Sequence, residues 1–286
     1  MGQMIINGLT TGLILALPAL ALSLTFSVLR FPNYAIGSYV TVGAFVTWYA
    51  NIVLQLPLWL AASSGAIATG LIAIGIDYVS YRHLRDRSGL ILLVASMGIG
   101  IALENIVRLF AGNSPRSFDL AVARPFRFWG LRVNQEQLII VATVLASLLA
   151  VWLVFRFSKL GRAMRAVADN PSLAASRGIE RGKVVASVWA ISGALAALAG
   201  VLIGIDTNIE PQMGWNYLLQ VFTAAILGGI ASPMAAVAGA VVLGLAEEFA
   251  TLFMAAHYRL IVAFGIMTLL LIVRPWGIFG TKWVQR

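Results

Sequence analysis

The fold is decided by the stretch MIINGLTTGLILALPALALSLTFSVL at residues 4–29, which contains no charged side chain. A helix that crosses the hydrocarbon core of a bilayer needs about 20 consecutive, mostly apolar residues. Similar stretches recur along the 286-residue chain, which is 60% hydrophobic and 11% charged, whereas an ordinary soluble domain is about 25% charged. The sequence therefore predicts an all-α, polytopic helical membrane protein and excludes a soluble enzyme.

The apolar stretches predict about eight to nine transmembrane helices in a single domain, residues 1–286. Two of the stretches, 33–51 and 217–231, are short and interrupted by glycine, which is typical of broken or re-entrant helices around a polar cavity. The predicted spans are 4–29, 33–51, 57–80, 89–110, 137–157, 184–205, 217–231, 233–254 and 257–273. The candidate substrate-path residues are Asn33, Gly37, Ser38, Thr41, Gly228, Gly229, Glu247 and Glu248.

Four ionisable residues lie well inside predicted spans, where a charge is costly and commonly functional. Glu104 and Arg108 stand four residues apart, a helical spacing at which they can neutralise each other. Glu247 and Glu248 are adjacent, so their side chains point about 100° apart and at most one is expected to face a given cavity. Two interpretations stay open for these glutamates, a structural hydrogen bond or the lining of a cavity.

The basic residues predict how the chain is oriented in the membrane. The segment 156–183 holds seven Lys or Arg against two acids, a net charge of +5 (7 − 2), and 81–88 and the tail are also basic. Two predicted spans separate 81–88 from 156–183, and four separate 156–183 from the tail. Because basic segments stay cytoplasmic, all three are expected inside, with 111–136 and the N-terminus outside. The basic residues of the tail are Arg274, Lys282 and Arg286.

The chemistry of the sequence gives no sign of catalysis. The chain has no cysteine, and its only Gly-Lys pair, Gly182-Lys183, is followed by Val184 instead of Ser or Thr. A phosphate-binding P-loop is therefore missing, and we expect no cofactor and no metal in this chain. The net charge of +9 is interpreted as orienting the chain among membrane lipids, with no nucleic acid as a partner.

The segment SKLGRAMRAVADNPSLAASRGIERGK at residues 158–183, which we term the coupling knob, predicts two short helices. Leu160, Met164 and Val167 recur at helical spacing. Asn170 is a predicted N-cap, and Gly178 follows the end of the second helix. Such a knob can rest on anionic lipid or dock a cytoplasmic partner that supplies energy. The candidate coupling residues are Arg162, Arg165, Asp169, Asn170, Pro171, Arg177 and Gly178.

Several stretches resemble one family. LGRAMRAVADNPSLAASRGI at 160–179 is similar to the cytoplasmic loop of the high-affinity branched-chain amino acid ABC permeases of the LivH type. Residues 7–45 resemble the N-terminal signature of that family, LGGIASPMAAVAGAVVLGLAEEF at 227–249 its glycine-rich segment, and LLLIVRPWGIFG at 269–280 its closing segment. The chain departs from the family at Ile36, where a histidine is usual, and at 230–235, which holds fewer glycines.

This resemblance implies a type II-like ABC importer permease in the bacterial plasma membrane, with amino acids, above all branched-chain or other aliphatic ones, as the cargo. The implied partners are a second permease subunit (LivM-like or a second copy), two cytoplasmic ATPase subunits and an extracytoplasmic solute-binding protein. The alternative is a self-sufficient ion-coupled carrier in which Glu247 or Glu248 binds the coupling ion.

Overall fold

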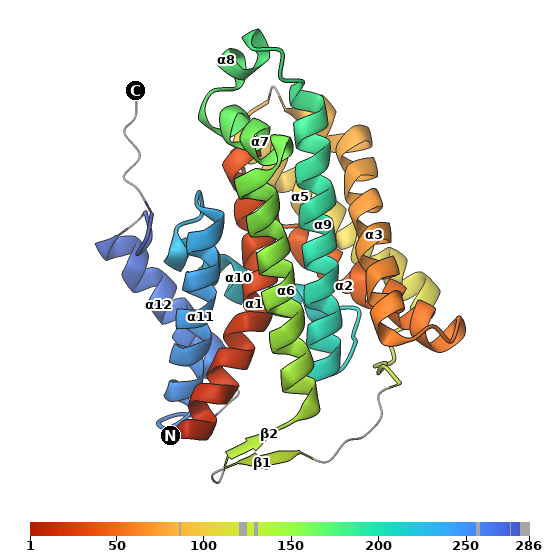
Figure 1. Ribbon diagram of the computed structural model, residues 1–286, viewed down its shortest axis with the longest axis vertical. Helices are drawn as coiled ribbons and strands as arrows, with labels where there is room; N and C mark the ends of the chain where they lie inside the picture. Colours follow the sequence, from red (N-terminus) through yellow and green to blue (C-terminus); the bar gives the residue numbers. More distant parts are fainter. Residues whose placement is uncertain (86, 120–124, 129–130, 256–257, 275, 281–286) are drawn as a thin grey trace.

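The computed structural model describes residues 1–85, 87–119, 125–128, 131–255, 258–274 and 276–280. Its long helices run roughly along the long axis of the molecule (Figure 1). Seven of the described helices are long and apolar enough to cross a membrane, which confirms the prediction of an all-α polytopic membrane protein. They are α1 (Gly2–Leu29), α2 with the π-helical η1 (Ile36–Val53), α3 to α4 (Leu58–Leu84), α5 (Gly89–Ala111), α6 (Gln135–Phe157), α9 (Arg181–Asp206) and α11 (Pro233–Ala250).

Two predicted spans form shorter helices. α10 (Met213–Gly228) has 16 residues and α12 (Arg259–Val273) has 15, fewer than the roughly 20 of a full span. The segment 207–212 before α10 is not helical, and within it Ile209 is buried and exchanges two backbone hydrogen bonds with Arg116. His257, the first residue of the predicted span 257–273, lies outside the described residues.

The expectation that 33–51 is broken or re-entrant is wrong. From Ile36 the chain is one continuous helix, α2 (Ile36–Trp48), which changes its hydrogen-bond spacing and continues as η1 (Tyr49–Val53). The segment 217–231 likewise contains no break before Gly228, where α10 ends. A helix that is apolar on every face is stable when it is surrounded by protein, and 72% of the span Ile36–Val53 is buried.

The bundle has a central and a peripheral set of helices. α1 and α9 are central, with 83% and 78% of their apolar windows buried, whereas α5 and α6 are peripheral, with only 17% buried. Glycine brings α1 close to α11, because a Cβ on Gly12 would lie 2.8 Å from the Cα of Val241. The peripheral helices expose apolar side chains such as Leu109 and Leu145, as expected of a surface that faces lipid or another subunit.

The two ends of the bundle differ (Figure 1). One end carries the N-terminus and the hairpin of β1 (Phe126–Phe128) and β2 (Leu131–Val133), and the Gln3 amide donates to the Arg132 carbonyl there (3.0 Å). The other end carries α4 (Arg82–Leu84) after η2 (Asp77–Tyr81), together with α7 (Lys159–Asp169) and α8 (Pro171–Ser176). The predicted grouping of 81–88 with 156–183, away from 111–136, agrees with this arrangement. Lys282 and Arg286 lie outside the described residues.

Candidate functional site

The coupling knob has the local structure that its sequence predicts. Asn170 caps α8 by accepting a hydrogen bond from the backbone N–H of Leu173 (3.1 Å), and Pro171 occupies the first position of that helix. Gly178 follows with φ +79°, in the left-handed region that a side chain with a Cβ disfavours. The start of α8 therefore depends on the side chain of Asn170, and its end depends on a glycine at position 178.

The apolar face of the knob packs on the bundle, and its charged side chains remain exposed. Met164 and Val167 are 1% exposed. Arg162 and Arg165 are exposed and donate to carbonyls at the end of α6, those of Phe157 (3.5 Å) and Phe155. Cations at the C-terminal end of a helix are stabilised by its dipole. The other two charged candidates of the knob, Asp169 and Arg177, are also exposed.

The polar candidates at the start of the second span hold helices together. Asn33 accepts hydrogen bonds from the backbone N–H of Ala35 (3.1 Å) and from the Tyr81 hydroxyl (3.3 Å). The Ser38 hydroxyl donates to a carbonyl of α5, that of Gly100 (2.9 Å). All these contacts are buried between helices.

Thr41 and Gly37 join α2 to the start of α10. Thr41 Oγ1 accepts from the backbone N–H of Gly214 (3.1 Å). A Cβ on Gly37 would lie 2.6 Å from the Gly214 carbonyl oxygen, so the two backbones touch only because both residues are glycine. Two cavities of the structure lie beside the end of α10 and beside Glu247. Their described lining residues include none of the four candidates Asn33, Gly37, Ser38 and Thr41.

A cavity of about 770 Å³, which we term the inner cavity, lies beside the end of α10. Its lining is largely apolar and aromatic and includes Tyr34, Phe222 and Ile226. Gly229 lines this cavity with φ +130°, whereas Gly228 packs against the backbone of α11 at Ala235. Of the two glycine candidates, only Gly229 therefore reaches an open space.

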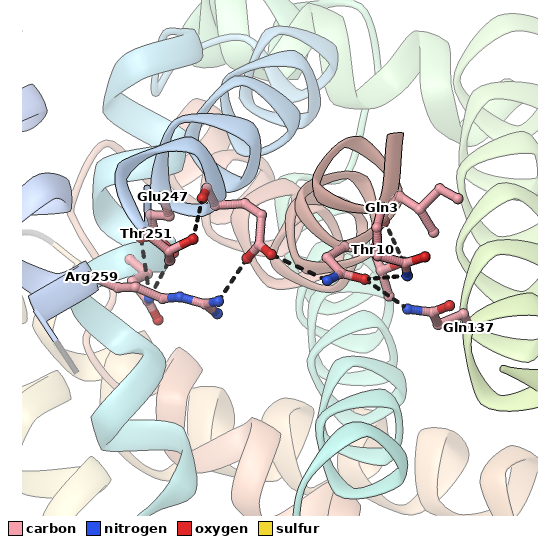
Figure 2. A network of polar contacts seen from close by, with 10 residues as sticks. Gln3, Thr10, Gln137, Glu247, Thr251 and Arg259 are labelled. Atoms are coloured by element: carbon pink, nitrogen blue, oxygen red, sulfur yellow. Dashed lines mark hydrogen bonds and ion pairs between the residues drawn. The ribbon is translucent and has the colours of Figure 1, made fainter. Parts of the chain in front are cut away.

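The two adjacent glutamates of α11 have different surroundings. Glu248 is the centre of a network that joins four helices (Figure 2): its carboxylate forms an ion pair with Arg259 of α12 (2.6 Å) and accepts from Asn7 of α1 (3.2 Å). The Asn7 side chain in turn accepts from Gln3 (3.2 Å) and from Gln137 of α6 (3.3 Å). Glu248 therefore holds α11 to α1 and α12.

Glu247 turns instead toward α10. Its carboxylate is 1% exposed and accepts from the amide nitrogen of Gln220 through both oxygens, at 3.1 and 3.0 Å. None of the ion pairs formed between described residues includes Glu247. The group is thus a buried carboxylate that is solvated by one neutral amide.

Glu247 lines a second cavity of about 440 Å³, which we term the outer cavity and which lies at the end of the molecule that carries the N-terminus. The expectation that at most one of the paired glutamates faces a given cavity is confirmed, because Glu248 is absent from this lining. Carboxylates and one guanidinium meet here, and neutral polar groups fill the gaps between them. The polar lining residues are Thr11, Asp206, Thr207, Asn208, Glu210, Asn216, Tyr217, Gln220, Glu247 and Arg259.

Sequence reasoning missed Arg259, Gln220 and Asp206 as site residues. Arg259 carried a signal, because it is an ionisable residue inside the predicted span 257–273. Gln220 and Asp206 carried no such signal, since neutral amides within spans and acids at the ends of spans are common in membrane proteins. The Glu104–Arg108 pair is confirmed as self-neutralising, with an ion pair of 2.5 Å.

These features define a class of protein: a polytopic helical membrane protein with a polar cavity, an apolar cavity and a capped projection at one end. Residues 4–271 match the family described as the branched-chain amino acid transport system permease component, and the chain belongs to that family.

Individual relatives agree with this assignment. The chain is 32% identical, over 99% of its length and 97% of the relative, to the high-affinity branched-chain amino acid transport system permease protein LivH of Salmonella typhimurium. It is 23% identical to the permease protein LivM of the same organism, over 85% of this chain and 62% of LivM.

A solved structure shows the same fold. The likeness is to a chain of PsaBC from Streptococcus pneumoniae, determined in complex with a Fab, with a TM-score of 0.50 and 15% identity. It covers 94% of this chain and 91% of that one, in agreement with the expected type II-like helical permease.

Proposed function

We propose that this chain is the membrane subunit of an ATP-binding cassette importer that carries branched-chain amino acids into the cell. The observation that carries the proposal is the match of residues 4–271 to a permease component of a branched-chain amino acid transport system. The family is described as one component of a system, which favours an importer with separate energy-supplying subunits over a self-sufficient ion-coupled carrier.

The partners follow from the same reasoning. Similarity to both LivH and LivM of one organism supports pairing with a second, related permease. Two cytoplasmic ATPase subunits would supply the energy, and an extracytoplasmic binding protein would deliver the cargo. The chain would lie in the plasma membrane of a bacterium and perform no covalent chemistry.

The two cavities suggest a path along α10. In the outer cavity Arg259 offers donors to an α-carboxylate, while Glu247 offers an acceptor to an α-ammonium group. The inner cavity is apolar enough for an aliphatic side chain. Gln220 belongs to the outer lining and Phe222, two residues later, to the inner lining. A shift of α10 would therefore change both cavities at once.

The coupling knob is the proposed contact with the ATPase subunits. Its helices are short and capped, and its exposed arginines Arg162, Arg165 and Arg177 would meet an acidic groove of the partner. In this proposal the knob lies in the cytoplasm together with 81–88 and the C-terminus, and the N-terminus and the outer cavity lie outside. The outer cavity would then meet the binding protein.

The energy source can be tested in the host cell with its other subunits present. Uptake of radioactive leucine, isoleucine and valine is measured in wild-type cells and in cells that lack this gene. We expect uptake that depends on the gene, is abolished by ATP depletion with arsenate, and persists when an uncoupler removes the proton gradient while ATP is maintained. Gene-dependent uptake that is lost with the uncoupler and survives arsenate would support the ion-coupled carrier and contradict the proposal.

A further inference from the structure

A third cavity, of about 480 Å³, lies between the end of α3 and the start of α9. Four cationic side chains line it, Arg82 and Arg85 on one side and Arg181 and Lys183 on the other. It lies at the end of the molecule that carries the knob and shares no lining residue with the inner or the outer cavity. We term it the basic cavity.

Two of these four cations are neutralised within the protein. Arg85 donates to both carboxylate oxygens of Asp77, at 2.6 Å to Oδ1, and both side chains are largely buried. Lys183 pairs with Glu180 (2.9 Å) at the surface. Asp77 and Glu180 are the two acids of the lining, so the charge of the lining is +2 (4 − 2).

The excess positive charge belongs to Arg82 and Arg181. Neither takes part in an ion pair between described residues. The Arg82 guanidinium lies over the ring of Tyr78, 5.3 Å from its centroid, a contact that orients the cation and leaves its charge intact. Both arginines are exposed and can reach an anion in the cavity.

The start of α9 adds further donors. The N-cap residue Glu180 makes no capping hydrogen bond with its side chain, so no N-cap side chain occupies the backbone N–H groups that begin this 26-residue helix. Gly182 lines the cavity, and a Cβ at this position would meet nothing within 4 Å. An anion can therefore approach the backbone closely.

An apolar stripe leads from the basic cavity along η2, which holds Tyr78, and α3 (Leu58–Ile76), which holds the other stripe residues. Ile67, Leu71 and Tyr78 are 65%, 62% and 63% exposed. Together with Ile74, which lines the cavity, their spacing of i, i+4, i+7 and i+11 places them on one helical face. The surface thus presents a cationic site above a continuous apolar strip, which suits a ligand with an anionic head and hydrocarbon tails.

We propose that the basic cavity binds the phosphate headgroup of an anionic phospholipid whose acyl chains lie along the stripe Ile67–Leu71–Tyr78. Basic pockets between membrane helices recognise such headgroups through charge. The lipid would bridge the helix that ends at Leu84 and the start of α9, whose first residues, 181–183, are the last part of the coupling knob. The apolar stripe favours a lipid over a free phosphate ion.

The test is native mass spectrometry of the permease, purified with its associated subunits and titrated with phosphatidylglycerol or phosphatidylcholine. The cavity variant is Arg82→Gln with Arg181→Gln. The matched control is Arg87→Gln with Arg156→Gln, two exposed arginines at the same end that remove the same charge outside the cavity. We expect preferential retention of phosphatidylglycerol by wild type and control, and about tenfold weaker retention by the cavity variant.

Three results would overturn the proposal. They are equal retention of phosphatidylcholine, unchanged retention by the cavity variant, and displacement of phosphatidylglycerol by an excess of inorganic phosphate, which would indicate a free-anion site. Should the cavity variant fail to fold, a salt titration of the wild type decides. Phosphatidylglycerol should then be released as the salt concentration rises, and retention independent of salt would contradict an electrostatic site.

Discussion

The two ends of this molecule use charge in opposite ways. At the end that carries the N-terminus charged groups are enclosed, where Glu248 is held by Arg259 and Asn7, and Glu247 by Gln220. At the end that carries the coupling knob, arginines such as Arg162 and Arg165 are exposed, and the same end also holds the largely buried ion pair of Arg85 and Asp77. A buried charge is costly unless it is paired or hydrogen-bonded, so the enclosed groups suit the small charged ligand of the proposed function. The exposed arginines of the knob suit the large partner surface that we propose.

We expect the largest effect on transport from a substitution of Glu247, the buried carboxylate that lines the outer cavity. Glu247→Gln keeps the shape of the side chain and removes the charge that would accept an ammonium group. Loss of a hydrogen bond to a charged group costs about 1.5–3 kcal/mol, so the initial rate of leucine uptake should fall by a factor of about 10–150. Glu136→Gln, an exposed acid at the same end, is the control and should transport normally. Normal uptake by a well-expressed Glu247→Gln variant would remove the outer cavity from the path.

Gly178→Val tests the inner end. A β-branched residue at φ +79° is strained by roughly 1–2 kcal/mol or more, so the end of α8 should rearrange and uptake should fall about tenfold while ATP hydrolysis continues. Gly178→Asn is the matched control, since asparagine tolerates this backbone region, and it should keep most of the uptake. If both variants transport like wild type, the knob is only a surface loop.

Arg259→Lys separates charge from geometry at the outer cavity. Lysine keeps the positive charge but loses the planar fork that can bind Glu248 and a substrate carboxylate together. Uptake should fall several-fold, less than for Arg259→Gln, which loses the charge as well. The two variants are compared by initial rates at saturating leucine and matched expression. Equal rates for lysine and glutamine would show that the charge of Arg259 plays no part.

Asn170→Ala should have the smallest effect. Loss of an N-cap costs about 1 kcal/mol, so amide hydrogen exchange within α8 should accelerate about fivefold, while uptake changes little. Ser172→Ala is the control, because the Ser172 hydroxyl only donates to Asn170 Oδ1 from the exposed side. Unchanged exchange in the Asn170 variant would mean that α8 is held by its packing and not by its cap.

Local features of this fold could be predicted from the sequence. The long uncharged stretch 4–29 became α1, and the caps at Asn170 and Gly178 lie where the sequence places them, because a cap depends on residues a few positions apart. Such interactions are visible without knowledge of the tertiary structure.

The outer cavity could not be predicted in the same way. Asp206, Gln220 and Arg259 come from α9, α10 and α12 and meet only when these helices pack. The polar groups of 33–51 were not predicted as helix contacts, yet Ser38 and Thr41 make hydrogen bonds to α5 and α10. A polar residue in a membrane helix can satisfy a neighbouring helix or line a cavity, and only packing distinguishes the two.

The central claim is that the outer cavity opens to the outside and the inner cavity to the cytoplasm. The chain contains no cysteine, so single cysteines can test it directly with a membrane-impermeant thiol reagent. Asn216→Cys reports on the outer cavity and Ser232→Cys on the inner one. We predict that Asn216→Cys is labelled in intact cells and Ser232→Cys only in inverted membrane vesicles. Labelling of Ser232→Cys in intact cells, with Asn216→Cys protected, would contradict the account.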